Sequence, residues 1–148
     1  MRQLSPPMPA SNTNTGRHEF ISYHSGAYTS EFAITVGFSR DPADESSIDG
    51  LLVERGRGVQ DDTPGIGGVY LEIPIQRHVA SGGITGATLR RDSFRVRIDD
   101  RTAREMGGFS EILIRFDVPD DSFKEIRDAL RFIFKGCTCY HEERETAA

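Results

Sequence analysis

An apolar stripe near the C-terminus is the feature that most restricts the fold of this chain. Five large apolar side chains recur at spacings of three, four, three and one: Phe123, Ile126, Leu130, Ile133 and Phe134. This spacing predicts a helix with one buried face. Ser122 with Glu125 fits a capping box, while Asp120 or Asp121 offers an alternative cap, and Gly136 supplies a stop. Such a stripe has to face a sheet, and a strand pattern precedes it directly.

Alternation of apolar and polar residues predicts the strands of that sheet. In the segment 110–118, Ile112, Ile114, Phe116 and Val118 fall on one face. The segment 30–39 places Phe32, Ile34, Val36 and Phe38 on one face in the same way. Further strands are expected at 19–28, 50–56 and 69–75, and Pro74 indicates that the last of these lies at an edge or ends there.

A hairpin and a short helix complete the prediction. The segments 84–91 and 93–98 read as two strands joined at Arg91-Asp92, with Phe94, Val96 and Ile98 buried and Arg95 and Arg97 in solvent. The segment 99–108 predicts a short helix, capped by Asp99 or Asp100 and ended by Gly107. The segments 39–49, 56–68 and 76–83 are polar or rich in glycine and are expected to be loops.

The order of these elements indicates an α+β fold. We expect a mostly antiparallel sheet of about six or seven strands, with the short helix and with the long C-terminal helix packed on one face. Residues 1–16 are expected to be a disordered N-terminal arm, residues 17–136 a single α+β domain, and residues 137–148 a flexible acidic tail.

Charge and targeting signals narrow the classes of function. The formal net charge is −5 and the pI about 5.4, whereas duplex-binding domains usually carry a positive excess. The N-terminus has no apolar run of a secretory signal, and no segment approaches the length of a membrane helix. The two cysteines make no disulfide framework. We therefore expect a cytoplasmic protein that does not bind membranes, and the composition disfavours nucleic acid as a partner.

Metal and cofactor sites are not expected. Cys137, Cys139 and His141 give a C-x-C-x-H pattern, but a structural zinc site needs a fourth ligand and no second pair lies at useful spacing. Gly65, Gly67 and Gly68 precede a strand, whereas a dinucleotide fingerprint follows a strand and opens a helix.

Catalytic groups are equally sparse, so we expect no enzyme. No G-x-S-x-G motif is present, and the adjacent carboxylate pairs do not build a two-carboxylate site, because neighbouring residues of a strand point apart. His78 is the best catalytic candidate, and it leaves open a small hydrolase or transferase that uses the loop around this residue. A second alternative is a nucleic-acid-binding adaptor that uses the arginines of 90–104; against it, these arginines form a solvated face balanced by Asp92, Asp99 and Asp100.

The segment 50–136 resembles the immunity protein 10 family of bacterial polymorphic toxin systems. The resemblance rests on LLVERG, VYLEIPIQ with Gln76, the glycines Gly82-Gly83, ATLRRDSFRVRIDD and EMGGF. It is strongest from Gly107 to Gly136, where a strand ending in Phe-Asp is followed by an acidic cap and a helix closing in Ile-Phe. The long N-terminal arm and the segment Cys137-Thr138-Cys139 depart from the family pattern.

The resemblance implies an immunity protein that binds a cognate toxin domain and neutralises it by non-covalent occlusion. Many such toxins attack nucleic acids through basic surfaces, so acidic loops suit this task. We accordingly expect the contact residues to be Asp41, Asp44, Glu45, Asp61, Asp62, Gln76 and His78. The sequence specifies neither the identity of the toxin nor the oligomeric state.

Overall fold

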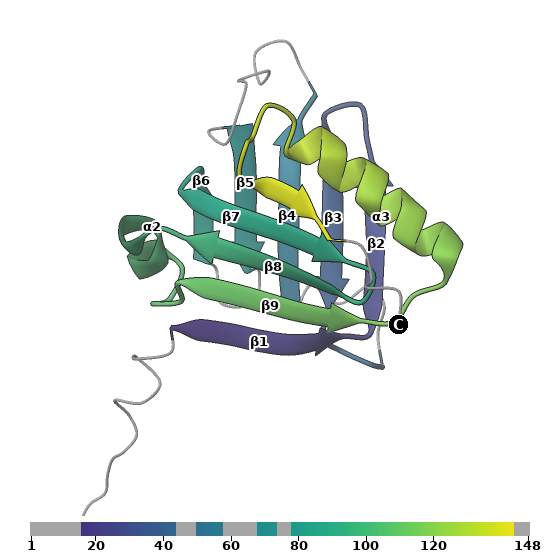
Figure 1. Cartoon of the computed structure of the whole chain (residues 1–148), viewed down its shortest axis with the longest axis horizontal. Helices are drawn as coiled ribbons and strands as arrows, with labels where there is room; N and C mark the ends of the chain where they lie inside the picture. Colours follow the sequence, from purple (N-terminus) through teal and green to yellow (C-terminus); the bar gives the residue numbers. More distant parts are fainter. Residues whose placement is uncertain (1–15, 44–49, 58–67, 74–77, 144–148) are drawn as a thin grey trace, which may run out of the picture.

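Two five-stranded sheets make up most of the computed structural model, which describes residues 16–43, 50–57, 68–73 and 78–143 (Figure 1). In order across the first sheet lie β1 (Arg17–Ser22), β9 (Glu111–Phe116), β8 (Ser93–Ile98), β7 (Ile84–Arg90) and β10 (Tyr140–Glu142). In order across the second sheet lie β2 (His24–Thr29), β3 (Ala33–Ser39), β4 (Gly50–Gly56), β5 (Val69–Ile73) and β6 (His78–Ser81). The helices are α2 (Asp100–Glu105) and α3 (Asp120–Ile133).

The α+β class is confirmed, but the described residues hold ten strands in two sheets, where one sheet of about six or seven was expected. Every pairing in the second sheet is antiparallel. In the first sheet, β1 pairs with β9 and β10 pairs with β7 in parallel. The additional strands come from a division of the segment 19–28, from β6 in a segment expected to be a loop, and from β10.

The division of the segment 19–28 occurs at Tyr23, where the chain passes from the first sheet to the second. The Ser22 hydroxyl lies 2.7 Å from that of Ser25 and donates to the His24 carbonyl, while Tyr23 N donates to the Ser39 carbonyl. These local bonds satisfy polar groups where the chain changes partners. The segment 19–28, which was predicted as one strand, therefore contributes to two strands in different sheets.

The two sheets cross face to face, and their facing side chains form one buried cluster (Figure 1). Alternation places Val36 and Phe38 in this cluster as predicted, but Phe32 lies before β3 and is 73% exposed. At the centre, the Phe94 ring of β8 lies 5.8 Å from Phe38 of the second sheet and 6.3 Å from Phe134. These rings connect the two sheets with the end of α3.

Helix α3 packs on the second sheet, beside the first sheet and on the same side (Figure 1). Its apolar stripe is confirmed, since Ile126, Leu130 and Ile133 are buried. The strand before it, β9, belongs to the other sheet, so proximity in sequence does not identify the face that the helix covers. The N-cap is Pro119, without a side-chain cap bond, and neither the predicted capping box nor a capping aspartate forms.

The hairpin and the short helix follow the prediction. Strands β7 and β8 pair antiparallel up to Arg90 and Ser93, and Arg91-Asp92 joins them. Asp99 caps α2 by accepting from Thr102 N at 2.7 Å, and this bond lowers the pKa of the Asp99 carboxyl. Gly107 follows the helix with φ +82°, a conformation that glycine adopts without strain. Strand β5 ends at Ile73, directly before Pro74.

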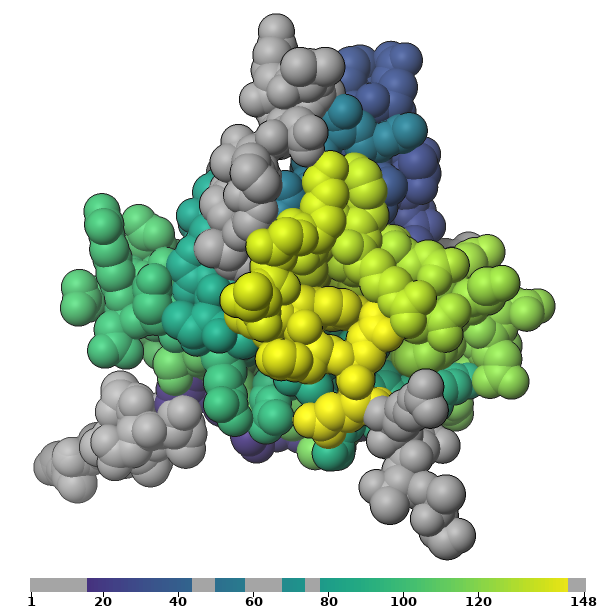
Figure 2. Space-filling model, turned by 45° about the horizontal axis from the view of Figure 1, so that its top comes forward, coloured from purple at the N-terminus to yellow at the C-terminus, as the bar shows by residue number. Residues whose placement is uncertain are grey.

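Residues 137–143 belong to the segment that was expected to be a flexible acidic tail, and they include the short strand β10. The Tyr140 ring stacks on Phe134 with centroids 5.2 Å apart, and Arg131 of α3 holds Glu142 through two bonds of 2.6 and 2.8 Å. Figure 2 shows the C-terminal segment lying against α3. Strand β10 is therefore fixed to the first sheet by its pairing with β7 and to the helix by Arg131, while Tyr140 OH donates to Glu142 within the strand.

Lowering the pH is expected to release β10. The bonds from Arg131, with a further bond from Tyr140, hold the pKa of Glu142 below its ordinary value. A carboxyl with a lowered folded-state pKa contributes stability above its unfolded pKa and loses that stability as the pH falls through the folded pKa. The protection factors of the amides of residues 140–142, which are exchange rates corrected for the intrinsic effect of pH, should therefore fall over this acidic range. In the Glu142→Gln variant the protection should be low at every pH, and an unaltered pH profile would contradict the role of Glu142.

Candidate functional site

The second sheet leaves one of its faces uncovered by the first sheet and by α3, which both pack on its other face (Figure 1). Side chains on this open face alternate with the buried row that contains Val36, Val53 and Leu71. The strand registers define the open face as two cross-strand rows: Tyr28, Thr35, Glu54, Tyr70 and Ser81, and beside them Gly26, Gly37, Leu52, Glu72 and Val79.

Tyr28 lies over two glycines of the open face. A Cβ built at Gly26 would lie 3.3 Å from the Tyr28 hydroxyl, and one built at Gly37 would lie 3.4 Å from the ring and 3.2 Å from Leu52. The missing side chains give the tyrosine a place on the sheet, and it is still 58% exposed. A groove of about 770 Å³ borders this edge, and Tyr28 and Asp117 are among the residues that line it.

Two carboxylates occupy the middle of the open face. Glu54 accepts from the Thr35 hydroxyl at 2.7 Å, and Glu72 accepts from the Tyr70 hydroxyl at 3.1 Å. Burial, followed by the bond to Glu72, raises the pKa of Tyr70, so this phenol stays a neutral donor. Both acids are half-buried on neighbouring strands. None of the ten residues that define the open face is a lysine, arginine or histidine.

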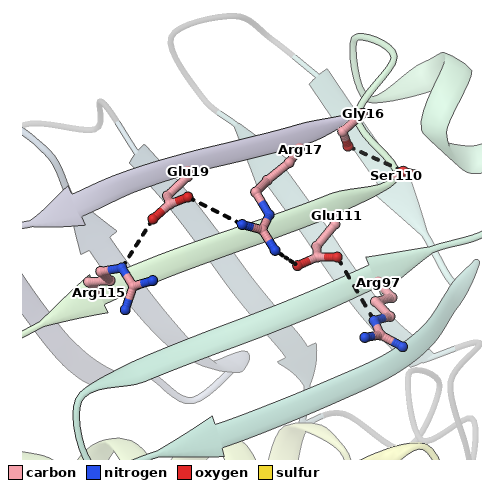
Figure 3. Close-up of polar contacts among 7 residues, drawn as sticks. All are labelled: Gly16, Arg17, Glu19, Arg97, Ser110, Glu111 and Arg115. Carbon is pink, nitrogen blue, oxygen red and sulfur yellow. Dashed lines mark hydrogen bonds and ion pairs between the residues drawn. The ribbon is translucent and has the colours of Figure 1, made fainter. Parts of the chain in front are cut away.

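The outer face of the first sheet has the opposite character. It carries a ladder of ion pairs across β1, β9 and β8 (Figure 3). Arg115 binds Glu19 at 3.1 Å, and Arg17 binds Glu19 at 3.5 Å and Glu111 at 3.0 Å. Arg97 closes the ladder at 4.0 Å from Glu111. Exposed pairs such as these contribute about 1 kcal/mol or less each, so the ladder matters more for surface charge than for stability.

The arginines of 90–104 were expected to be balanced by Asp92, Asp99 and Asp100. After the bonds from Thr102, the charge of Arg101 also lowers the pKa of Asp99, whereas three other arginines have different partners. Arg90 binds Glu143 at 2.6 Å, Arg91 binds Asp120 at 2.8 Å, and Arg97 lies beside Glu111. These partners come from other elements of the fold. Arg95 and Arg97 do share the outer face and Phe94 is buried on the inner one, as predicted.

Of the predicted contact residues, only Asp41 and His78 lie within the described residues. Asp41 follows β3 and accepts from Ala43 N at 2.9 Å, a local turn bond. His78 lies at the start of β6, on the covered side of the sheet, with its ring against Gly107. The structure does not bring these two residues together. The other five contact residues, Asp44, Glu45, Asp61, Asp62 and Gln76, lie outside the described residues.

Metal ligands, apolar helices and thiols are further features of the described residues that bear on function. No cluster of three or more His, Cys, Asp or Glu suited to a metal occurs among the described residues. Nor does either described helix have the length and apolar character needed to cross a membrane. Cys137 and Cys139 are free and half-buried, and burial raises the pKa of both thiols, which makes them weaker nucleophiles at neutral pH.

A known protein family matches much of this chain. The Immunity protein 10 family matches residues 24–124, which is more than half of the 148 residues. This chain belongs to the immunity protein 10 family. The resemblance seen in the sequence is thereby confirmed. No curated protein and no solved structure matched.

In this immunity protein 10 family member, the matched region begins at the first residue of β2 and ends in the first turn of α3. It therefore contains the whole second sheet and its open face, together with β7, β8 and β9. The two strands that pair in parallel at the edges of the first sheet, β1 and β10, lie outside it. The candidate site is thus built entirely within the part that defines the family.

The open face was missed in the sequence because its residues are not contiguous. The pattern that predicts β4 and β5 already indicates that Leu52, Glu54, Tyr70 and Glu72 point away from the core. That signal could have placed them on one surface if the pairing of the two strands had been known. It could not have shown that α3 packs on the other face of the sheet.

Proposed function

We propose that this protein is an immunity protein that binds a cognate bacterial toxin domain and neutralises it by non-covalent occlusion in the cytoplasm. The match to the family over residues 24–124 carries the proposal. Occlusion needs a rigid scaffold with an accessible surface, and the second sheet provides both. Tyrosines in that surface supply contact area at low entropic cost.

The hydrolase alternative finds little support in the surroundings of His78. A base needs a group that orients its ring, and none of the hydrogen bonds and ion pairs among the described residues joins His78 to a carboxylate. The nucleic-acid alternative is weakened by the pairing of Arg90, Arg91 and Arg97 with acids of the same chain.

Stoichiometry tests the proposal. The C-terminal domain of the secreted protein encoded beside this chain's gene would be expressed with and without this chain in a bacterial host. We expect growth to be restored and, in vitro, toxin activity to fall linearly to zero at about one chain per toxin, with both in one complex on gel filtration. Full neutralisation at a few hundredths of an equivalent would indicate catalysis instead. If the toxin stayed active at a saturating concentration of this protein, the proposal would be overturned.

A further inference from the structure

The charges of the two outer faces differ in sign. The open face of the second sheet carries Glu54 and Glu72, and no basic residue stands among the ten residues that define it. The outer face of the first sheet carries five arginines: Arg17, Arg90, Arg95, Arg97 and Arg115. Their acidic neighbours are Glu19, Glu111 and, beside Arg90, Glu143. The molecule therefore offers a partner two surfaces that attract opposite charges.

The carboxylates of the open face retain unused capacity to accept hydrogen bonds. Each has two oxygens that can accept several bonds, and the structure gives each one bond from a neutral hydroxyl. A partner that covered this face with apolar groups alone would bury two charges without compensation, which costs several kcal/mol for each ion. A partner that docks here therefore has to bring cations.

Aromatic and aliphatic side chains surround these acids. In one row Tyr70 is the direct neighbour of Glu54, and Tyr28 lies one strand further on its other side, beyond Thr35. In the other row Leu52 and Val79 flank Glu72. Aromatic rings hold the stems and heads of arginine and lysine side chains by packing and by cation–π attraction. This combination is typical of an interface centre that receives a long basic side chain.

We infer that the open face of the second sheet docks a basic segment of the toxin, with Glu54 and Glu72 pairing its arginine or lysine side chains and with Tyr28 and Tyr70 packing against them. This inference rests on the proposed function, and it moves the expected contact surface from the acidic loops to a sheet face. A second copy of this chain is a poorer occupant. Four of the five arginines on its first sheet are already paired with acids of their own chain.

A charge-matched pair of variants tests the role of the acids. Glu54→Gln/Glu72→Gln removes two charges from the open face and leaves acceptors for Thr35 and Tyr70. Glu19→Gln/Glu111→Gln removes two charges from the outer face of the first sheet. Association with a catalytically inactive form of the neighbouring toxin domain would be measured by stopped-flow at low and high salt, and the folding of each variant by thermal melting.

We expect the open-face variant to associate about tenfold more slowly or worse at low salt, with the difference shrinking at high salt. The first-sheet variant should stay within about twofold of the wild type. Suppose that the wild type binds the toxin tightly. If the two variants then change the association rate equally, or if neither changes it, the inference is overturned and the proposed function stays intact. A wild type that does not bind the toxin would overturn the proposed function itself.

A second pair of variants tests the role of the aromatic side chains. Tyr28→Ala should raise the dissociation rate about tenfold or more, whereas Ile21→Ala, which truncates a side chain of similar exposure on the first sheet, should leave it unchanged. An equal response of the two would count against the open face. The molar mass of the protein without toxin would also be measured by light scattering. If mutation of Glu54 and Glu72 changed that mass, the open face would bind a second copy of the chain, and this too would count against the inference.

Discussion

Phe94→Ala is expected to lower the free energy of unfolding by about 3–5 kcal/mol, the range found for removing a buried phenylalanine from a core. The Phe94 ring has no exposed surface and belongs to a chain of aromatic contacts that includes Phe38, Phe116 and Phe134. Its loss would leave a cavity where the two sheets and the end of α3 meet. Tight packing on all sides prevents the surroundings from closing that cavity.

Urea unfolding followed by circular dichroism would measure this effect. The control is Phe32→Ala, which removes the same atoms at a position that is 73% exposed. We expect the control to change the stability by no more than about 0.5 kcal/mol. A loss below about 1 kcal/mol for Phe94→Ala would mean that the two sheets do not depend on this ring.

The elements that sequence reasoning located correctly are those defined by local patterns. Helix α3 has a stripe of period 3.6, and the β7–β8 hairpin has two alternating arms with a short connection. In both cases the residues that specify the element are neighbours in the chain, and burial of one face then follows from the period alone.

The division into two sheets could not be predicted because it depends on partners far apart in the sequence. Strand β1 pairs with β9, more than ninety residues away, and nothing in the segment 17–22 identifies that partner. Strand β10 is only three residues long and is held by Arg131 and Phe134 of the preceding helix. Residues 140–142 of the charged tail thus form a strand because of tertiary contacts, which cannot be predicted from the local strand propensity of the segment.

The candidate site shows the same limit. Acidic residues cluster at 41–62 in the sequence, and because of this cluster the contact residues were predicted to lie in loops. Glu54 and Glu72 stand eighteen positions apart, and they become one surface only when β4 and β5 pair. The loop residues Asp61 and Asp62 remain a prediction. Both lie outside the described residues.

Arg55→Ala is expected to destabilise the fold by about 3–5 kcal/mol, because it removes a hydrogen bond made by a charged group and leaves a cavity in place of a large buried side chain. Arg55 of β4 has no exposed surface, and its Nε donates to the Ile133 carbonyl at the C-terminal end of α3 at 2.6 Å. The negative end of the helix dipole compensates the buried charge. The same guanidinium lies near the Cys137 thiol and lowers its pKa against the larger effect of burial. Without Arg55, the carbonyl loses its donor and a large side chain leaves a void.

Two further variants separate these causes. Arg55→Met fills most of the volume but leaves the Ile133 carbonyl without that donor, so we expect a loss of about 1–3 kcal/mol. Arg57→Ala removes an exposed guanidinium that donates to the Ser30 carbonyl at 2.5 Å, and it should cost about 1 kcal/mol or less. If Arg55→Ala proved as mild as Arg57→Ala, α3 would be held by its apolar stripe alone. We instead expect the loss of stability to be largest for Arg55→Ala, smaller for Arg55→Met and smallest for Arg57→Ala. In that case the hydrogen bond from Arg55 helps to hold α3 on the sheet that carries the open face.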